Sequence, residues 1–160
     1  DHPVEHADKE LRRILHERVA ELEARRSADL PTRVGSVIRG CLLSGKVTPA
    51  QVADRLGTST RTLSRRLGAL GTSFEAVLDQ TRFDLACHLL ADSTASMTKL
   101  TELLGFAHSS AFTRAFRRWS GTSPRAWREE NRHREAAELA VAAAASAARS
   151  RSPPVGSTQR

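Results

Sequence analysis

The sequence has no tyrosine, one methionine and two cysteines, and aromatic residues make up only 4% of its 160 positions. A folded core therefore has to be packed mainly from aliphatic side chains, and with 39% hydrophobic residues the chain can form one. No apolar run approaches the roughly 20 residues that span a bilayer, and no signal peptide is recognisable. We therefore expect no membrane partner and a cytoplasmic location.

The cysteines and histidines do not form a pattern typical of a metal site. Cys41 and Cys87 are far apart within helical patterns, which favours two reduced core residues and leaves a disulfide as the alternative. His2 and His6 have the i, i+4 spacing of a zinc pair, but no third ligand follows at a suitable spacing. No grouping of nucleophile, base and acid stands out either. The sequence thus predicts no metal, no cofactor and no enzymatic activity.

Positive charge is concentrated in the middle of the chain, whose net charge is +7 overall. Residues 31–134 hold sixteen Lys and Arg against eight Asp and Glu, whereas residues 1–30 have a net charge of −2 and residues 135–160 of +1. A basic block inside a folded domain is typical of nucleic-acid binding, although an acidic protein or a membrane surface also attracts such a block.

Helical periodicity recurs along the sequence and strand patterns do not, so we predict an all-α fold. Capping boxes at Thr48–Gln51 and Thr72–Glu75 indicate the starts of two helices, and Pro124 indicates the start of the last one. The helices are expected over residues 5–26, 31–44, 49–56, 60–68, 73–91, 97–104 and 109–119, and from Pro124 onward.

The two ends of the chain have their own patterns. Residues 1–28 are predicted to form an amphipathic helix, with an apolar stripe at Leu11, Ile14, Leu15, Val19 and Leu22. This stripe needs a partner, which is another domain, a second copy or, as the simpler alternative, the rest of this domain. Residues 135–160 are predicted to be an alanine-rich helical extension followed by a disordered tail.

Two of the predicted helix pairs resemble each other. The segment VADRLGTSTRTLSRRL (52–67) aligns with LTELLGFAHSSAFTRAF (100–116) if the second turn holds one extra residue. Gly57 then matches Gly105, and Arg65 matches Arg114. Each copy predicts a helix-turn-helix unit, with a glycine at positive φ in the turn. One such unit alone is equally consistent with DNA binding and with helical packing, whereas two copies favour DNA binding.

The stretches TRTLSRRLGALGTSFEAVLDQTR (60–82) and LLGFAHSSAFTRAFRRWSGTSPRAWR (103–128) resemble the DNA-binding domain of the AraC/XylS family of bacterial transcription regulators. The second stretch has the family's glycine–aromatic pair, serine-rich turn, F-x-R-x-F, G-x-S-P and an aromatic residue before arginine. The sequence departs from the family at three positions: Thr58 replaces the usual apolar residue, Thr101 the usual alanine and Trp127 the usual tyrosine.

The resemblance implies two homeodomain-like helix-turn-helix subdomains, at about 31–71 and 92–128, joined by a linker helix at about 73–91. Together they form a DNA-binding domain over residues 29–134. The resemblance also implies that a sensing or dimerising domain precedes Asp1, and the amphipathic helix over residues 1–28 is the expected connector to it. Double-stranded DNA is the expected partner, RNA polymerase is a candidate second partner, and the protein would be nucleoid-associated when bound to DNA.

The exposed face of the second helix in each unit contains the candidate base-reading residues. In the first unit, Arg61, Ser64 and Arg65 lie opposite Leu63 and Leu67 at helical spacing, and no Asp or Glu occurs between Arg55 and Phe74. An arginine there can pair with guanine O6 and N7 in the major groove. The predicted base-contacting residues are Thr60, Arg61, Ser64 and Arg65 in the first unit and Ser109, Ser110, Thr113 and Arg114 in the second.

Other polar residues beside these helices are predicted to contact DNA phosphates, which adds affinity without sequence information. They are Lys46, Ser59, His108, Arg117 and Arg118. The predicted function is sequence-specific duplex DNA binding that regulates transcription. The alternative is a helical protein-interaction module whose basic face binds an acidic partner.

Overall fold

The computed structural model of the chain describes the backbone of residues 3–150, with side chains from Arg13 to Ala148 except at positions 14, 27 and 28. Throughout this described part the fold is helical, which confirms the all-α prediction. The helices are α1 (Pro3–Ala28), α2 (Leu30–Ser44), α3 (Pro49–Arg55), α4 (Thr60–Ala69), α5 (Phe74–Asp92), α6 (Met97–Leu103), α7 (Ser109–Ser120) and α8 (Pro124–Ser150). None of these described helices is long and apolar enough to cross a membrane.

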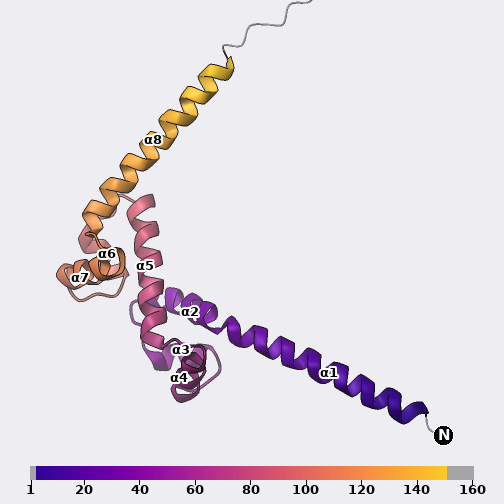
Figure 1. The fold of residues 1–160 in the computed structure, drawn as a ribbon. Helices are drawn as coiled ribbons and strands as arrows, with labels where there is room; N and C mark the ends of the chain where they lie inside the picture. Colours follow the sequence, from indigo (N-terminus) through magenta and orange to yellow (C-terminus); the bar gives the residue numbers. More distant parts are fainter. Residues whose placement is uncertain (1–2, 151–160) are drawn as a thin grey trace, which may run out of the picture.

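Helix α5 joins two small groups of helices (Figure 1). Helices α2, α3 and α4 gather at one end of α5, and α6, α7 and the start of α8 gather toward the other end. Helix α1 and the far part of α8 project away from both groups. This arrangement is the tandem helix-turn-helix fold that the sequence predicted, with α5 as the linker helix.

Each group has its own core, and α5 contributes to both. The first core is aliphatic, with Val77 and Leu78 from α5 packed against buried side chains of α2, α3 and α4. The second core includes Ala86 and Leu90 from α5 and is packed with most of the chain's few aromatic rings. These rings are Phe83, Phe106, Phe112, Phe116, Trp119 and Trp127. Burial of such side chains contributes roughly 1.5–3 kcal/mol each, so both units have a hydrophobic basis for their fold.

The two groups also contact each other directly. Gly105 lies in the turn between α6 and α7, and a Cβ placed on it would be 3.3 Å from Cδ2 of Leu42 in α2. Leu42 is itself buried in the first core. The turn of the second unit therefore packs against the first unit, and α5 is not the only connection between them.

Local hydrogen bonds explain where the helices begin. Thr48 forms the predicted capping box, in which its Oγ1 accepts the Gln51 N–H at 3.2 Å and the Gln51 side chain accepts the Thr48 N–H. The predicted capping box at Thr72–Glu75 is wrong. Ser73 is the N-cap of α5 and accepts the Ala76 N–H at 3.1 Å, so the residue three positions later is an alanine and cannot complete a box.

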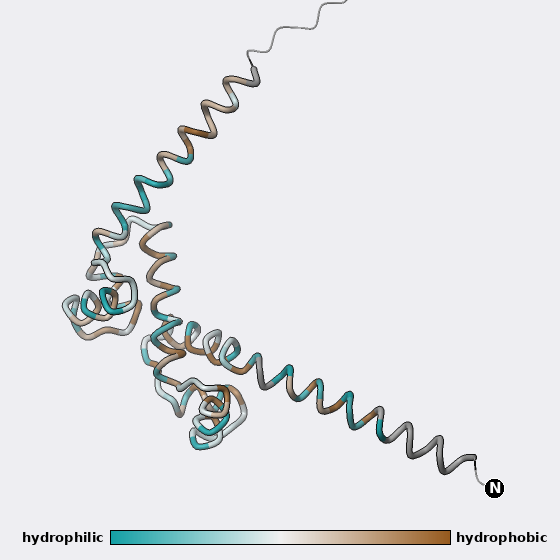
Figure 2. Tube along the Cα trace, viewed as in Figure 1, coloured by the Kyte–Doolittle hydropathy of each residue, from teal (hydrophilic) through white to brown (hydrophobic). Residues whose placement is uncertain are grey.

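The projecting helices differ in part from expectation. In α1, the side chains of Leu15, Val19 and Leu22 are 56%, 51% and 47% exposed, so this part of the stripe does not pack on the domain; Leu11 and Ile14 fall outside the described side chains. Helix α8 continues without interruption past residue 134 to Ser150, so no helix end marks the predicted boundary there. Its projecting part includes apolar segments that no other element covers (Figure 2). The predicted tail over residues 151–160 lies outside the described residues.

Candidate nucleic-acid interface

The two helix-turn-helix units share one hydrogen-bond pattern in their turns. In the first, the Thr58 N–H donates to the Ala53 carbonyl at 2.9 Å, and in the second the Phe106 N–H donates to the Thr101 carbonyl at 3.0 Å. Gly57 and Gly105 precede these donors with φ of 67° and 74°, a region that L side chains rarely adopt. Helix α4 starts three residues after its glycine and α7 four residues after, which confirms the extra residue that the alignment required.

Helix α4 buries one side and exposes the other, as predicted. Leu63 and Leu67 are 2% and 0% exposed, whereas Arg61, Ser64 and Arg65 are all exposed to solvent. Throughout the described chain, no hydrogen bond or ion pair involves the guanidinium of Arg61 or Arg65. Both groups therefore keep their donors free for a ligand. Thr60, at the first position of the helix, is also exposed.

The equivalent face of α7 carries fewer charges. Arg114 and Ser110 are exposed, whereas Thr113 is half-buried. Phe112 and Phe116, at 1% and 0% exposed, anchor the opposite side of the helix. At 100° per residue, Ser110 and Arg114 occupy the positions on α7 that Arg61 and Arg65 occupy on α4, relative to the buried pair. The two helices thus present corresponding faces of unequal charge.

Thr101 connects α6 to α7 at their close crossing. Its hydroxyl donates to the Met97 carbonyl at 2.7 Å and lies 3.4 Å from Oγ of Ser109, and Thr101 as a whole is only 4% exposed. The buried Thr101 hydroxyl therefore has hydrogen-bond partners, which the alanine usual at this position would not need. Ser109, a predicted base-contacting residue, is exposed but has this contact inside the protein, which orients it toward α6.

The predicted phosphate-contacting residues lie at the starts of α4 and α7, within α7 and, for Lys46, in the loop between α2 and α3. Lys46, His108 and Arg117 are exposed, and no described residue forms an ion pair with them. Ser59 caps α4, with its Oγ accepting the Thr62 N–H at 3.1 Å. His108 occupies the N-cap position of α7 without a side-chain cap, so N–H groups at this helix end are open to an acceptor.

Arg118 has a partner that the sequence did not indicate. Its Nη2 lies 3.5 Å from Oδ2 of Asp79 on α5, and its guanidinium stands 6.0 Å from the ring centroid of Trp119. The two residues are 39 positions apart, so only the fold brings them together. Because the Arg118 side chain is 65% exposed, the pair lies at the surface and remains accessible to a competing anion.

Comparison with known proteins agrees with the tandem helix-turn-helix fold. A family model described as a helix-turn-helix domain matches residues 52–130. The regulator VirS of Mycobacterium tuberculosis, described as an HTH-type transcriptional regulator, is 33% identical over 126 residues, which are 79% of this chain and 37% of VirS. A solved transcriptional regulator of Chromobacterium violaceum, described as an AraC-type DNA-binding domain-containing protein, has the same fold, with a TM-score of 0.58 at 23% identity over 67% of this chain and 96% of that one.

The chain belongs to the AraC/XylS family. The DNA-binding domain of AdpA, solved in complex with a target DNA, is 29% identical to this AraC/XylS chain. The two structures have a TM-score of 0.55, and the match covers 66% of this chain and 94% of the AdpA domain. The chain spans little more than a third of the length of VirS.

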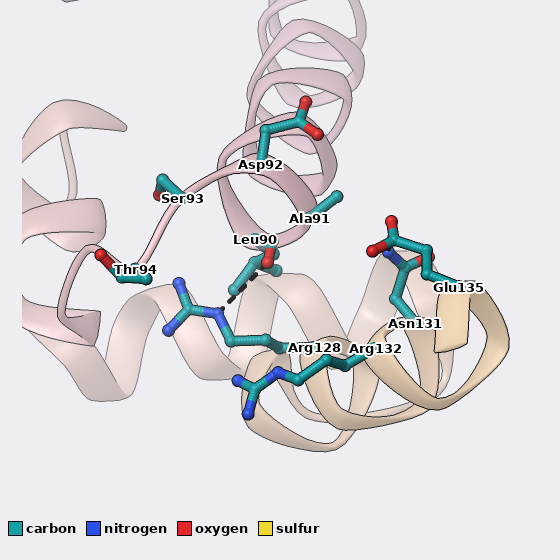
Figure 3. Close-up of a pocket in the computed structure, with 9 residues that line it drawn as sticks. All are labelled: Leu90, Ala91, Asp92, Ser93, Thr94, Arg128, Asn131, Arg132 and Glu135. Carbon is teal, nitrogen blue, oxygen red and sulfur yellow. Dashed lines mark hydrogen bonds between the residues drawn. The ribbon is translucent and has the colours of Figure 1, made fainter. Parts of the chain in front are cut away.

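Two arginines of this AraC/XylS domain hold the fold together and are not on the recognition helices. Arg82 on α5 donates from Nε to the Leu104 carbonyl at 2.9 Å, at the end of α6. Arg128 on α8 donates from Nη2 to the Ala95 carbonyl at 2.9 Å and from Nε to the Leu90 carbonyl at 3.3 Å (Figure 3). Burial lowers the pKa of both guanidinium groups, and at Arg128 the nearby charge of Arg132 lowers it further. The positive charge of the domain is thus only partly available to DNA.

Figure 3 also shows the hollow of about 380 Å³ beside Arg128, between the end of α5 and the first turns of α8. Its walls carry both signs of charge, from Arg132 and from Asp92 and Glu135. Asn131 is 8% exposed and donates to Glu135 at 2.9 Å, and Arg132 forms an ion pair with Glu129 at 3.6 Å. Nothing in this arrangement indicates a small-molecule site.

A metal site would require a group of the described cysteines, histidines and carboxylates. No group of three His, Cys, Asp or Glu side chains among them is placed to hold a metal ion. Cys41 is buried and Cys87 is half-buried, and both are free thiols. Burial, with a smaller effect of Asp84, raises the pKa of Cys87 to about 11, which keeps it protonated and unreactive near neutral pH.

Proposed function

We propose that this chain binds duplex DNA in a sequence-specific manner and regulates transcription, with α4 and α7 entering successive major grooves. The observation that carries the proposal is the unpaired arginine face of α4. Arg61 and Arg65 are exposed on a helix whose other side is fixed in the core by Leu63 and Leu67. Family membership and the likeness to a DNA-bound domain support the same conclusion.

The two recognition helices differ, and so should the two halves of the DNA site. Because α5 and the Leu42–Gly105 contact connect the units, we expect α4 and α7 to lie about 34 Å apart on one face, one DNA turn. The site is then directional, with two short boxes about 10 bp apart. The α4 box should be read mainly by arginine, and the α7 box by Arg114 with the hydroxyls of Ser110 and Thr113.

The remaining predicted residues position the protein on the DNA backbone. Lys46, Ser59, His108 and Arg117 are exposed and would contact phosphates without reading sequence. Arg118 would join them by exchanging the Asp79 carboxylate for a phosphate. Since the chain spans 37% of VirS, we further propose that the complete protein has a sensing or dimerising domain, to which α1 is the connector. RNA polymerase is the partner expected for a regulator that activates transcription.

Selection of bound sequences from a random duplex pool tests the proposal. We expect one asymmetric sequence with two boxes to be enriched, and a footprint of one protomer to cover both boxes on one face of the duplex. Binding should weaken steeply as salt concentration rises. Enrichment of no sequence, with equal affinity for selected and scrambled duplexes, would contradict the proposal and favour an acidic protein as the partner. A symmetric palindrome bound by one protomer would contradict the two-groove geometry.

A further inference from the structure

A second group of arginines lies outside the two recognition faces. Arg26 at the end of α1, Arg33 in the first turns of α2 and Arg66 on the flank of α4 line one hollow of about 550 Å³. Leu30 and Leu56 contribute its apolar part, and Leu30 is buried in the first core. Three separate helices thus each contribute one arginine to the lining of this hollow.

These three arginines are not paired within the protein. Each is exposed, and no ion pair or hydrogen bond links any of the three guanidinium groups to another described residue. Glu23 lines the same hollow, but no salt bridge joins it to any of the three arginines. The hollow therefore has a net positive charge, and its like charges repel one another unless an anion lies among them.

The position of the hollow favours one kind of anion. Arg66 directly follows Arg65 on α4, and at 100° per residue it points to the side of the helix, between the base-reading face and the core. A helix placed in the major groove has the phosphate strands along its flanks. The flank of α4 that carries Arg66 continues into the hollow with Arg33 and Arg26.

We propose that the hollow of Arg26, Arg33 and Arg66 binds a backbone phosphate of the DNA that flanks the α4 box. The inference rests on the proposed function, because α4 must occupy a major groove for this flank to meet the DNA. The junction of α1 and α2 would then contribute to DNA affinity, and this contribution is separate from the contacts made by the second helix-turn-helix unit. The contact adds affinity and salt dependence and leaves sequence preference unchanged.

The test uses the full chain and two variants of one helix. Arg33→Gln removes a charge from the hollow, and Arg39→Gln removes a charge from the same helix six residues later, about 240° around it. Salt titrations on selected and scrambled duplexes should give a slope about one unit lower for Arg33→Gln, and about two units lower for the Arg26→Gln/Arg33→Gln double variant. Arg39→Gln should match the wild type, and all variants should keep the wild-type sequence preference.

A gain-of-binding variant excludes misfolding as the cause. Glu23→Gln should strengthen binding to both duplexes, because it removes the one negative charge of the hollow. Phosphate-ethylation interference should show a site on the flank of the α4 box that disappears in the double variant. If the wild type and the double variant have equal salt slopes while the wild type still prefers its selected site, the inference is wrong and the proposed function stands. The hollow would then be a binding site for an acidic protein segment. Loss of sequence preference in the wild type overturns the proposed function and the inference with it.

Discussion

The Arg82 guanidinium on α5 lies against the turn of the second unit, with its Nε 2.9 Å from the Leu104 carbonyl and its Nη2 3.3 Å from the Gly105 carbonyl. The same group stands 4.6 Å from the centroid of the Phe106 ring. The linker helix therefore binds the end of α6 directly, in addition to its packing in both cores. Burial lowers the pKa of Arg82, but Asp79 and Glu75 act in the opposite direction and favour the charged form.

We predict that Arg82→Ala destabilises the domain by about 2–3 kcal/mol, because it leaves the Leu104 carbonyl without its charged donor and removes the contact with Phe106. Urea unfolding measures the change. Arg39→Ala, an exposed and unpaired arginine on α2, is the matched control and should change the free energy of unfolding by less than about 0.5 kcal/mol. A stability of Arg82→Ala equal to that of the control would contradict the structural role.

The two turn glycines allow the contact between the units to be tested separately. Gly57→Ala and Gly105→Ala both force an L residue to positive φ, which costs about 1–2 kcal/mol. Only at Gly105 does the new Cβ also approach Leu42 and Arg82, at 3.3 and 3.4 Å. We therefore expect Gly105→Ala to be the more destabilising in thermal unfolding and to weaken binding to a two-box site more than Gly57→Ala. Equal effects would show that the Leu42 contact does not matter.

The sequence predicted features that arise from local patterns. The Thr48 capping box, the glycine turns and the buried face of α4 follow from residues within a few positions of each other, and the structure confirms them. The Thr72–Glu75 box was wrong because two adjacent hydroxyl residues competed for the N-cap of α5, and Ser73 took it. Either residue has the oxygen that the cap requires, so composition alone could not decide between them.

Arginine roles were harder to predict because they depend on tertiary contacts. Arg82 and Arg128 bond carbonyls 22 and 33 positions away, and Arg118 meets Asp79 across 39 positions. An exposed arginine of a recognition helix and an arginine that caps a distant helix end look alike in a sequence. The glycine at 105, which aligns with Gly57, indicated where a turn lies but not that Arg82 and Leu42 pack on it.

Arg65→Ala tests base reading on α4. Since Arg65 is exposed and unpaired, its loss should leave helicity unchanged and weaken binding to the selected site by about 1–3 kcal/mol, with relaxed preference at one or two base pairs. Lys46→Ala is the control, since loss of a phosphate contact there should weaken binding to the selected and the scrambled duplex alike. If Arg65→Ala lost the same amount of affinity for the selected and the scrambled duplex, Arg65 would be a phosphate contact and not a base contact.

Removal of residues 1–28 tests the place of α1. The exposed Leu15, Val19 and Leu22 contribute nothing to either core, so the shortened chain should fold and keep the sequence preference of the full one. Its salt slope should fall by up to about one unit, because Arg26 is lost from the hollow. Circular dichroism and the salt titration measure the two effects. A shortened chain that does not fold would show that α1 belongs to the domain.

Asp79 and Arg118 offer a test of exchange between an ion pair and DNA. An exposed pair at 3.5 Å contributes roughly 0–1 kcal/mol, so neither Arg118→Ala nor Asp79→Asn should alter the unfolding midpoint much. On DNA the two variants should act in opposite directions. Arg118→Ala should weaken binding to the selected and the scrambled duplex about equally and lower the salt slope by about one unit. Asp79→Asn should strengthen binding to both duplexes, because it releases Arg118.

The double variant decides whether Asp79 acts through Arg118. If Asp79 only competes with phosphate for that guanidinium, Asp79→Asn should have little effect in the Arg118→Ala background, and a double-mutant cycle of DNA affinities should show strong coupling. Asp79 also places a negative charge near Arg82 and favours its charged form, so Asp79 can affect DNA binding without acting through Arg118. Additive effects in the cycle would show that Asp79 acts through the general field or Arg82, and Arg118 would then keep its carboxylate partner when DNA is bound.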